Sequence, residues 1–222
     1  MSVPLILLPG LGANARMYRL QKKVIPNLIT PEWIAPYKRE SLPAYAERFV
    51  KSLGLQDPYY LGGASFGGIM AQEMAKVQPP LGLFLISSTR SPAAMTAWLQ
   101  KVSSVAHITQ ILPWQSASLL AEVGLNLPER WLPYRLKMVL KHLHHDETDF
   151  MRWGLRAVLR WRPTPGTANY PVHQIHGELD PFLPARQSQA DIIVPGAGHL
   201  LTKSHAEVVN QFLLERLQPK PE

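Results

Sequence analysis

The fold of this chain is decided by the stretch Gly62-Gly63-Ala64-Ser65-Phe66-Gly67-Gly68, which follows an apolar run and leads directly into a helical segment. We expect a strand at Tyr59 to Leu61 and a helix at Ile69 to Val77 on its two sides. Residues 63 to 67 match the pattern Gly-x-Ser-x-Gly, whose glycines let a strand and a helix approach closely. A serine on such a tight turn exposes its hydroxyl at the carboxyl edge of a sheet. The stretch therefore predicts Ser65 as a nucleophile.

Outward from this turn, apolar runs alternate with helical segments. Val3 to Leu8 and Leu81 to Ile86 are continuous apolar runs, typical of strands that are buried on both faces of a parallel sheet. The other predicted strands lie between Asn27 and Ile34, at Val172 to Ile175 and at Ala190 to Val194. The other predicted helices lie at Arg16 to Lys23, Ser41 to Leu53 and Ser204 to Leu217. Strands that alternate with helices at this spacing predict an α/β fold with right-handed crossovers.

Between residues 91 and 165 the pattern changes, because no strand-like run appears and helical signals dominate. We therefore predict a core formed by residues 1–90 and 166–222 and a helical cap inserted at 91–165. A cap over the carboxyl edge of an open sheet creates a largely apolar pocket above Ser65, suited to an acyl chain or an aromatic group. We expect most tryptophans of this segment to pack onto the sheet, and Trp98, Trp114 and Trp153 to line the pocket.

One helix of the cap is expected to begin near residues 146–149, where acidic side chains suit a first turn. Its aromatic and small residues at helical spacing, Phe150, Trp153, Ala157 and Trp161, fall on one face. Its basic residues, Arg152, Arg156, Arg160 and Arg162, hint at acidic substrate groups, although arginine on a helix is usually solvated.

Two further loops follow predicted strands and carry the groups that a serine nucleophile needs. Asp180 comes directly after a strand, where it can accept a hydrogen bond from an imidazole and fix its tautomer. Glu178 is its nearest competitor and is less well placed by the motif. His199 lies between the last strand and the last helix, with glycines beside it. Ser65, Asp180 and His199 thus occur in that chain order, each just beyond a strand.

With these residues in this order, the sequence resembles the α/β-hydrolase fold superfamily, in a small version with a helical cap. The resemblance covers residues 1 to about 90 and 166–222, and it implies a mostly parallel sheet of about six strands without the N-terminal hairpin. It also implies that Leu11 and Phe66 supply the backbone amides of an oxyanion hole. Pro9 stands where the family usually has histidine, which leaves the backbone donor intact. Relatives that open epoxides or remove halide carry aspartate at the position of Ser65.

The resemblance implies an esterase or thioesterase that acts on small molecules through an acyl-enzyme, with Ser65, His199 and Asp180 as its triad. No metal or organic cofactor is needed. Acyltransferases, C–C bond hydrolases and lyases use the same triad, and a non-catalytic ligand receptor is a further alternative. Residues 10–15 also fit a dinucleotide pattern, which leaves the triad unexplained. Residues 142–146 contain three histidines, and we favour a solvated helix end over a metal site there.

Composition excludes several classes of protein. The chain has 222 residues, 46% hydrophobic and 18% charged, with no cysteine and a net charge of +7. This balance excludes disorder and collagen-like fibres, and the lack of cysteine excludes disulfides and a thiolate nucleophile. No apolar run approaches the ~20 residues of a membrane span, and no basic signal-peptide region precedes the first strand, so we expect a cytoplasmic protein. The basic residues form no dense block, so we expect no nucleic-acid partner. A sheet without the N-terminal hairpin leaves one edge uncovered as a candidate dimer surface, so we expect a monomer or homodimer.

Overall fold

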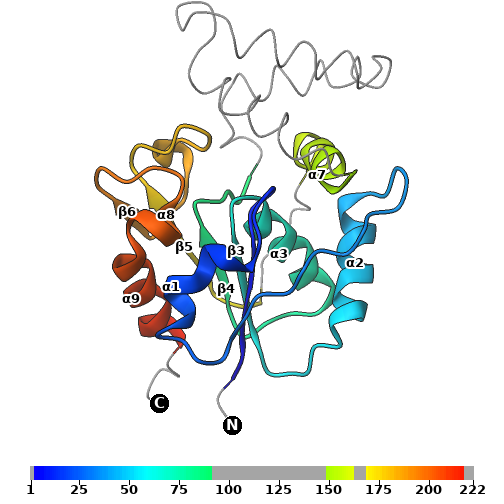
Figure 1. The fold of residues 1–222 in the computed structure, drawn as a ribbon, viewed down its shortest axis with the longest axis horizontal. Helices are drawn as coiled ribbons and strands as arrows, with labels where there is room; N and C mark the ends of the chain where they lie inside the picture. The colour runs from blue at the N-terminus through cyan, green and yellow to red at the C-terminus, as the bar shows by residue number, and fades with distance from the viewer. Residues whose placement is uncertain (1–2, 92–148, 163–168, 218–222) are drawn as a thin grey trace, which may run out of the picture.

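Six parallel strands form the centre of the molecule. The computed structural model describes residues 3–91, 149–162 and 169–217. Its strands are β1 (Leu5–Leu8), β2 (Leu28–Ile29), β3 (Tyr60–Ala64), β4 (Leu83–Ile86), β5 (Val172–Gly177) and β6 (Ile192–Val194), in the spatial order β2-β1-β3-β4-β5-β6 (Figure 1). Every neighbouring pair is parallel. The predicted α/β fold with a parallel sheet of about six strands is confirmed.

Helices cover both faces of this sheet (Figure 1). One layer contains α2 (Leu42–Leu53), α3 (Phe66–Val77) and α7 (Asp149–Arg160), and the other contains η1 (Ala15–Tyr18), α1 (Arg19–Lys22), α8 (Leu201–Ser204) and α9 (Ala206–Leu217). A short 3-10 helix, η4 (Ala185–Gln187), lies between β5 and β6. Side chains of β1 alternate between the two layers, with Ile6 and Leu8 in one core cluster and Leu5 and Leu7 in the other. The continuous apolar run therefore reports burial on both faces.

Some elements differ from the sequence prediction at their ends. Helix α3 begins at Phe66 and not at Ile69, because the chain turns within one residue at Ser65. The closing helix predicted at Ser204 to Leu217 is α9, which begins at Ala206, and a short helix α8 that was not predicted precedes it, separated by His205, whose φ of −132° is not helical. Helix α2 agrees closely with the prediction, since the Ser41 hydroxyl accepts a hydrogen bond from the Ala44 amide and caps it.

Of the predicted cap, the structure describes Ser91 and residues 149–162. The predicted helix is α7, and its aromatic face packs against the core as expected, with Trp153, Ala157 and Trp161 buried there. Trp98, Trp114 and residues 142–146 lie outside the described residues, and the limits 91 and 165 stay a prediction. Within the described ranges, none of the helices combines the length and the apolar character that crossing a membrane requires.

Candidate active site

Ser65 lies at the turn between β3 and α3, in a backbone conformation that few residues adopt. Its φ is 52° and its ψ is −118°, which is a left-handed, strained geometry for a residue with a side chain. The Ser65 amide donates a 3.0 Å hydrogen bond to Ile86 O at the end of β4, which holds the turn against the sheet. The side chain is half-buried. Strain at a partly exposed serine is typical of a nucleophile turn.

The glycines around Ser65 are required by close backbone contacts. A Cβ atom on Gly63 would lie 2.6 Å from Gly67 O and 2.8 Å from Gly68 N. A Cβ atom on Gly67 would overlap Leu8 O and lie 2.6 Å from Pro9 O. Helix α3 therefore begins in direct contact with both β3 and the end of β1, which the Gly-x-Ser-x-Gly pattern predicted for the strand–helix pair.

The loop after β1 lies beside the serine and carries Leu11. A Cβ atom on Gly10 would be 3.7 Å from Ser65 Cβ, so the two segments are in van der Waals range. In the described part of the chain, the amides of Leu11 and Phe66 have no hydrogen-bond acceptor. A helix N-terminus and an adjacent loop with unused amides suit a developing negative charge. The role of these two amides as an oxyanion hole stays a prediction.

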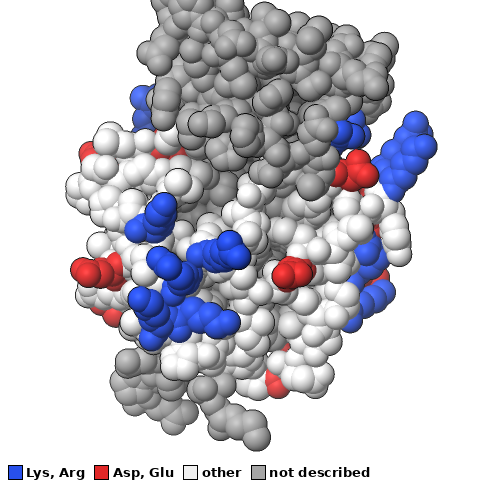
Figure 2. Space-filling model, in the orientation of Figure 1, with Lys and Arg blue, Asp and Glu red and all other residues white. Residues whose placement is uncertain are grey.

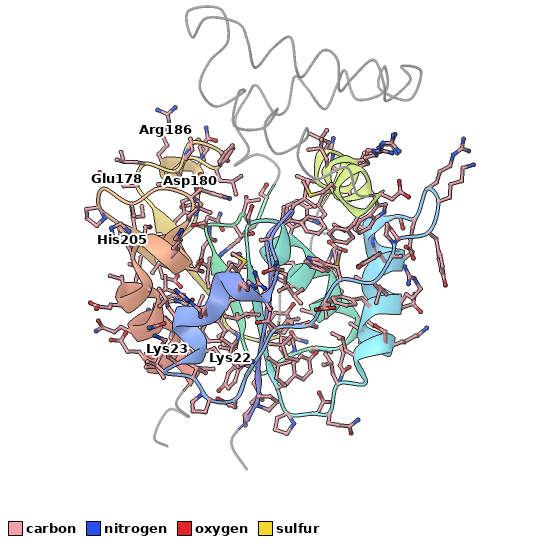
Figure 3. The ribbon with its side chains drawn as sticks, viewed as in Figure 1. Lys22, Lys23, Glu178, Asp180, Arg186 and His205 are labelled. Carbon is pink, nitrogen blue, oxygen red and sulfur yellow. The ribbon has the colours of Figure 1, made fainter. Side chains whose placement is uncertain are left out.

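The loops after β5 and β6 bring Asp180 and His199 together. A Cβ atom on Gly177 would lie 2.5 Å from Ala197 O, so the two loops touch at this position. Nδ1 of His199 donates a 2.7 Å hydrogen bond to Asp180 Oδ2. Glu178 is exposed and its Oε2 accepts from the Gly196 amide instead. Of the two acids weighed from the sequence, the structure joins Asp180 to the histidine, and Figure 3 shows Asp180 on the segment that follows β5.

His176 also contacts Asp180, and the sequence analysis did not select it. Its Nε2 lies 2.6 Å from Leu183 O and 3.2 Å from Asp180 Oδ2. Both neighbours are acceptors, so Nε2 carries the proton, and the buried Nδ1 has no partner among the described residues. The signal that could have identified His176 is its position near the carboxyl end of a buried strand, four residues before the acid.

Asp180 is held by four N–H groups. The two imidazoles donate to Oδ2, and the amides of Phe182 and Leu183 donate to Oδ1 at 2.9 and 3.0 Å. Burial on its own raises the pKa of the Asp180 carboxyl, but the hydrogen bonds from His176, His199 and Leu183 outweigh it and hold that pKa well below its usual range. The carboxylate is therefore ionised and fixed in direction, as an acid that orients a histidine must be.

Ser65 and His199 lie on loops at the same edge of the sheet, but no hydrogen bond joins them. In the described residues, Ser65 Oγ has no hydrogen-bond partner. His199 packs against the ring of Phe182, with centroids 5.0 Å apart. The structure thus joins two of the three predicted triad residues directly and leaves the contact with Ser65 a prediction.

Helix α7 packs against both residues predicted to supply the oxyanion amides. A Cβ atom on Gly154 would overlap Leu11 Cδ1. Trp153 packs edge-on against Phe66, with centroids 6.1 Å apart, and its indole N–H donates to Glu40 O at 2.8 Å. Trp33, Tyr45, Phe49 and Phe150 belong to the same aromatic cluster. Trp153 is 8% exposed, and its predicted place in a substrate pocket is untested.

Comparison with known proteins agrees with this fold. The sequence model of the alpha/beta hydrolase family matches residues 5–212. No curated protein matches the sequence. A thermophilic esterase from Thermogutta terrifontis has 18% identity, covers 98% of this chain and 90% of its own, and gives a TM-score of 0.68. The Bacillus megaterium epoxide hydrolase has 14% identity, with coverages of 97% and 93% and a TM-score of 0.66. The meta-cleavage product hydrolase from Pseudomonas fluorescens has 14% identity, coverages of 96% and 90%, and a TM-score of 0.63. At these identities the structural likeness concerns the fold alone.

Proposed function

Since the chain belongs to the alpha/beta hydrolase family, we propose that it is a serine hydrolase that cleaves a carboxylic ester or thioester of a small molecule. The observation that carries this proposal is the 2.7 Å hydrogen bond from His199 to a buried carboxylate, at the sheet edge where a strained turn presents Ser65. A serine with an oriented histidine is the arrangement that acyl transfer to water requires.

In the proposed reaction, Ser65 Oγ attacks the carbonyl carbon and His199 Nε2 accepts the hydroxyl proton. Asp180 keeps the proton of His199 on Nδ1 and stabilises the imidazolium that forms. The amides of Leu11 and Phe66 donate to the oxyanion. His199 then gives its proton to the leaving alcohol or thiol. In the second half of the reaction, His199 accepts a proton from a water molecule that attacks the acyl-enzyme, and then returns it to Ser65 Oγ as the carboxylic acid leaves. No metal or organic cofactor enters these steps.

The aromatic cluster around Phe66 supports a substrate with an apolar acyl or aromatic group. Phe66 directly follows the nucleophile, and Phe150 and Trp33 pack beside it and are only partly buried. Apolar walls with a few polar groups are the usual lining of a small-molecule site. Epoxide opening, the activity named for the Bacillus megaterium neighbour, is disfavoured because residue 65 is serine and not aspartate.

The test is covalent labelling with a fluorophosphonate probe, followed by intact-mass measurement. We expect one probe per wild-type molecule, and none on Ser65→Ala or His199→Ala. The chain offers a matched control, because Ser204 Oγ and His205 Nδ1 are hydrogen-bonded at 2.9 Å without an acid in the described contacts. Ser204→Ala and His205→Ala should label like wild type.

Loss of labelling in the control pair but not in the Ser65 variant would place the nucleophile elsewhere. A folded wild type that does not label would favour a non-catalytic receptor. Once labelling is established, a panel of acyl esters and thioesters of varied chain length gives the substrate class. Product analysis with added alcohols separates hydrolysis from acyl transfer to another acceptor.

A further inference from the structure

A groove of about 1050 Å³ lies between α7 and the segment that leads into α2. Tyr37, Trp153 and Trp161 contribute aromatic rings to its lining. Two carboxylates, Glu40 and Asp149, also face it. The cationic side chains that line it are Lys38, Arg39, Arg152, Arg156, Arg160 and Arg162. Its volume is that of a pocket for a ligand larger than a single inorganic ion.

Both carboxylates are already engaged. Glu40 accepts two hydrogen bonds from Arg48, at 2.8 and 2.9 Å, and one from the Tyr37 amide. Asp149 lies 3.5 Å from Arg152. Within residues 3–91, 149–162 and 169–217, the other five cations have no ion-pair partner. The groove therefore has a clear excess of positive charge.

The arginines on α7 are arranged in one row. Arg152, Arg156 and Arg160 follow at intervals of four residues, which places them about 6 Å apart along one helix face. Like charges at this spacing destabilise a helix. The core contacts of α7 are made by its apolar residues, whereas Arg156 and Arg160 are exposed. A row of this kind is stabilised when an anion binds across it.

The two walls of the groove are tied to each other. The Trp153 indole on α7 donates to Glu40 O in the opposite wall. In that wall, the turn from Tyr37 to Glu40 is closed by the Glu40 amide, which donates to Tyr37 O at 3.1 Å, and Arg48 fixes the Glu40 carboxylate. Arg39 has a φ of 63° and lies at the tip of this turn. The cations are thus presented by a preformed frame, which reduces the entropic cost of binding.

We propose that this groove binds a small polyanionic molecule, with two or more phosphate or carboxylate groups that pair with the arginines of α7 and the cations of residues 38 and 39. Guanidinium groups bind the paired oxygens of phosphate and carboxylate with two parallel hydrogen bonds. The site is distinct from Ser65 and does not depend on the proposed hydrolase activity. It shares α7 with the candidate active site, because Gly154 and Trp153 of that helix contact Leu11 and Phe66.

The test is isothermal titration of the full chain with tripolyphosphate and with citrate at low ionic strength. We expect saturable binding of one ligand per molecule, and at least tenfold weaker binding in an Arg156→Glu/Arg160→Glu variant. The control is Lys22→Glu/Lys23→Glu, which changes the net charge equally at the exposed basic surface of α1 (Figures 2 and 3). The Ser65→Ala variant should bind like wild type.

A second variant, Lys38→Glu/Arg39→Glu, alters the opposite wall and should weaken binding in the same way without touching α7. Equal weakening by the α1 control, or binding of neither anion to folded wild type, would overturn the proposal. Comparison of the two probes distinguishes phosphate from carboxylate. Once an esterase activity is established, a higher KM of the groove variants for anionic esters, with an unchanged KM for neutral esters, identifies the anion as part of the substrate. A change in turnover of neutral esters on adding tripolyphosphate identifies a separate effector, and either result supports the site.

Discussion

Replacement of Gly67 by alanine should damage both the fold and the predicted oxyanion hole. The new Cβ would lie 2.6 Å from Pro9 O and 2.7 Å from Leu8 C, and closer still to Leu8 O. An ordinary C···O contact is about 3.3 Å, so the overlap with Pro9 O alone is about 0.7 Å. Leu8 O cannot rotate away freely, because it accepts a 2.8 Å hydrogen bond from the buried Tyr18 hydroxyl. We expect a loss of about 3 kcal/mol in the free energy of unfolding, the upper end for overpacking.

Gly10 is the matched control, because it lies on the loop after β1 that faces the Ser65 turn but has room for a methyl group. An alanine Cβ there would be 3.6 Å from Ala64 O and 3.7 Å from Ser65 Cβ, which are ordinary contacts. Because alanine also restricts the unfolded chain, we expect Gly10→Ala to unfold at the same or a slightly higher urea concentration. Urea unfolding and the rate of fluorophosphonate labelling would be measured for both variants. A Gly67→Ala protein as stable and as rapidly labelled as wild type would refute the steric argument.

Three further predictions follow from individual contacts. Asp180→Asn should fold and lose up to ~10⁴ in turnover, and a loss below about tenfold would count against Asp180 as the orienting acid. Because the folded-state pKa of the Asp180 carboxyl is depressed, the stability that this carboxylate contributes is present above pH ~4 and is lost as the pH falls. The free energy of unfolding in urea should therefore fall more between pH 6 and pH 3 for wild type than for Asp180→Asn. Equal falls in the two proteins would contradict this. Trp161→Phe should lower the free energy of unfolding by about 2 kcal/mol, because it removes a hydrogen-bond donor to the buried Glu73 carboxylate. Trp153→Phe should lower it less, because it loses only a hydrogen bond to a backbone carbonyl. The reverse order in urea unfolding would refute this ranking.

The sequence predicted two central strands most directly, because they lie in continuous apolar runs that only a doubly covered sheet can bury. Val3 to Leu8 and Leu81 to Ile86 contain β1 and β4, and Ser41 marks the start of α2. Element ends were less predictable. The start of α3 at Phe66 and the short helix α8 before His205 depend on turn geometry that no hydrophobic period reports.

The candidate site was predictable where loops follow strands, because the carboxyl ends of parallel strands meet at one edge. That rule placed Asp180 beside His199 across 19 residues of sequence. It did not indicate His176, which lies within β5 and meets Asp180 because the chain turns directly after that strand, where the Asp180 amide donates to Gly177 O. Nor did it show that Gly154 of α7 abuts Leu11, because helix–loop contacts across the insertion depend on tertiary packing.

These contacts also indicate which parts of the predicted triad are held in place. The backbone of Ser65 is fixed by Ile86 O, and Asp180 is fixed by four donors, of which only His199 belongs to the triad. Asp180 therefore keeps its direction when His199 turns. The Ser65 side chain can rotate about its Cα–Cβ bond, and the loop that carries His199 is itself held, because the Leu179 amide donates to Ala197 O at 2.8 Å. In the proposed mechanism the Ser65–His199 contact therefore forms beside a carboxylate that keeps its place, and substrate binding is the step at which such contacts tighten.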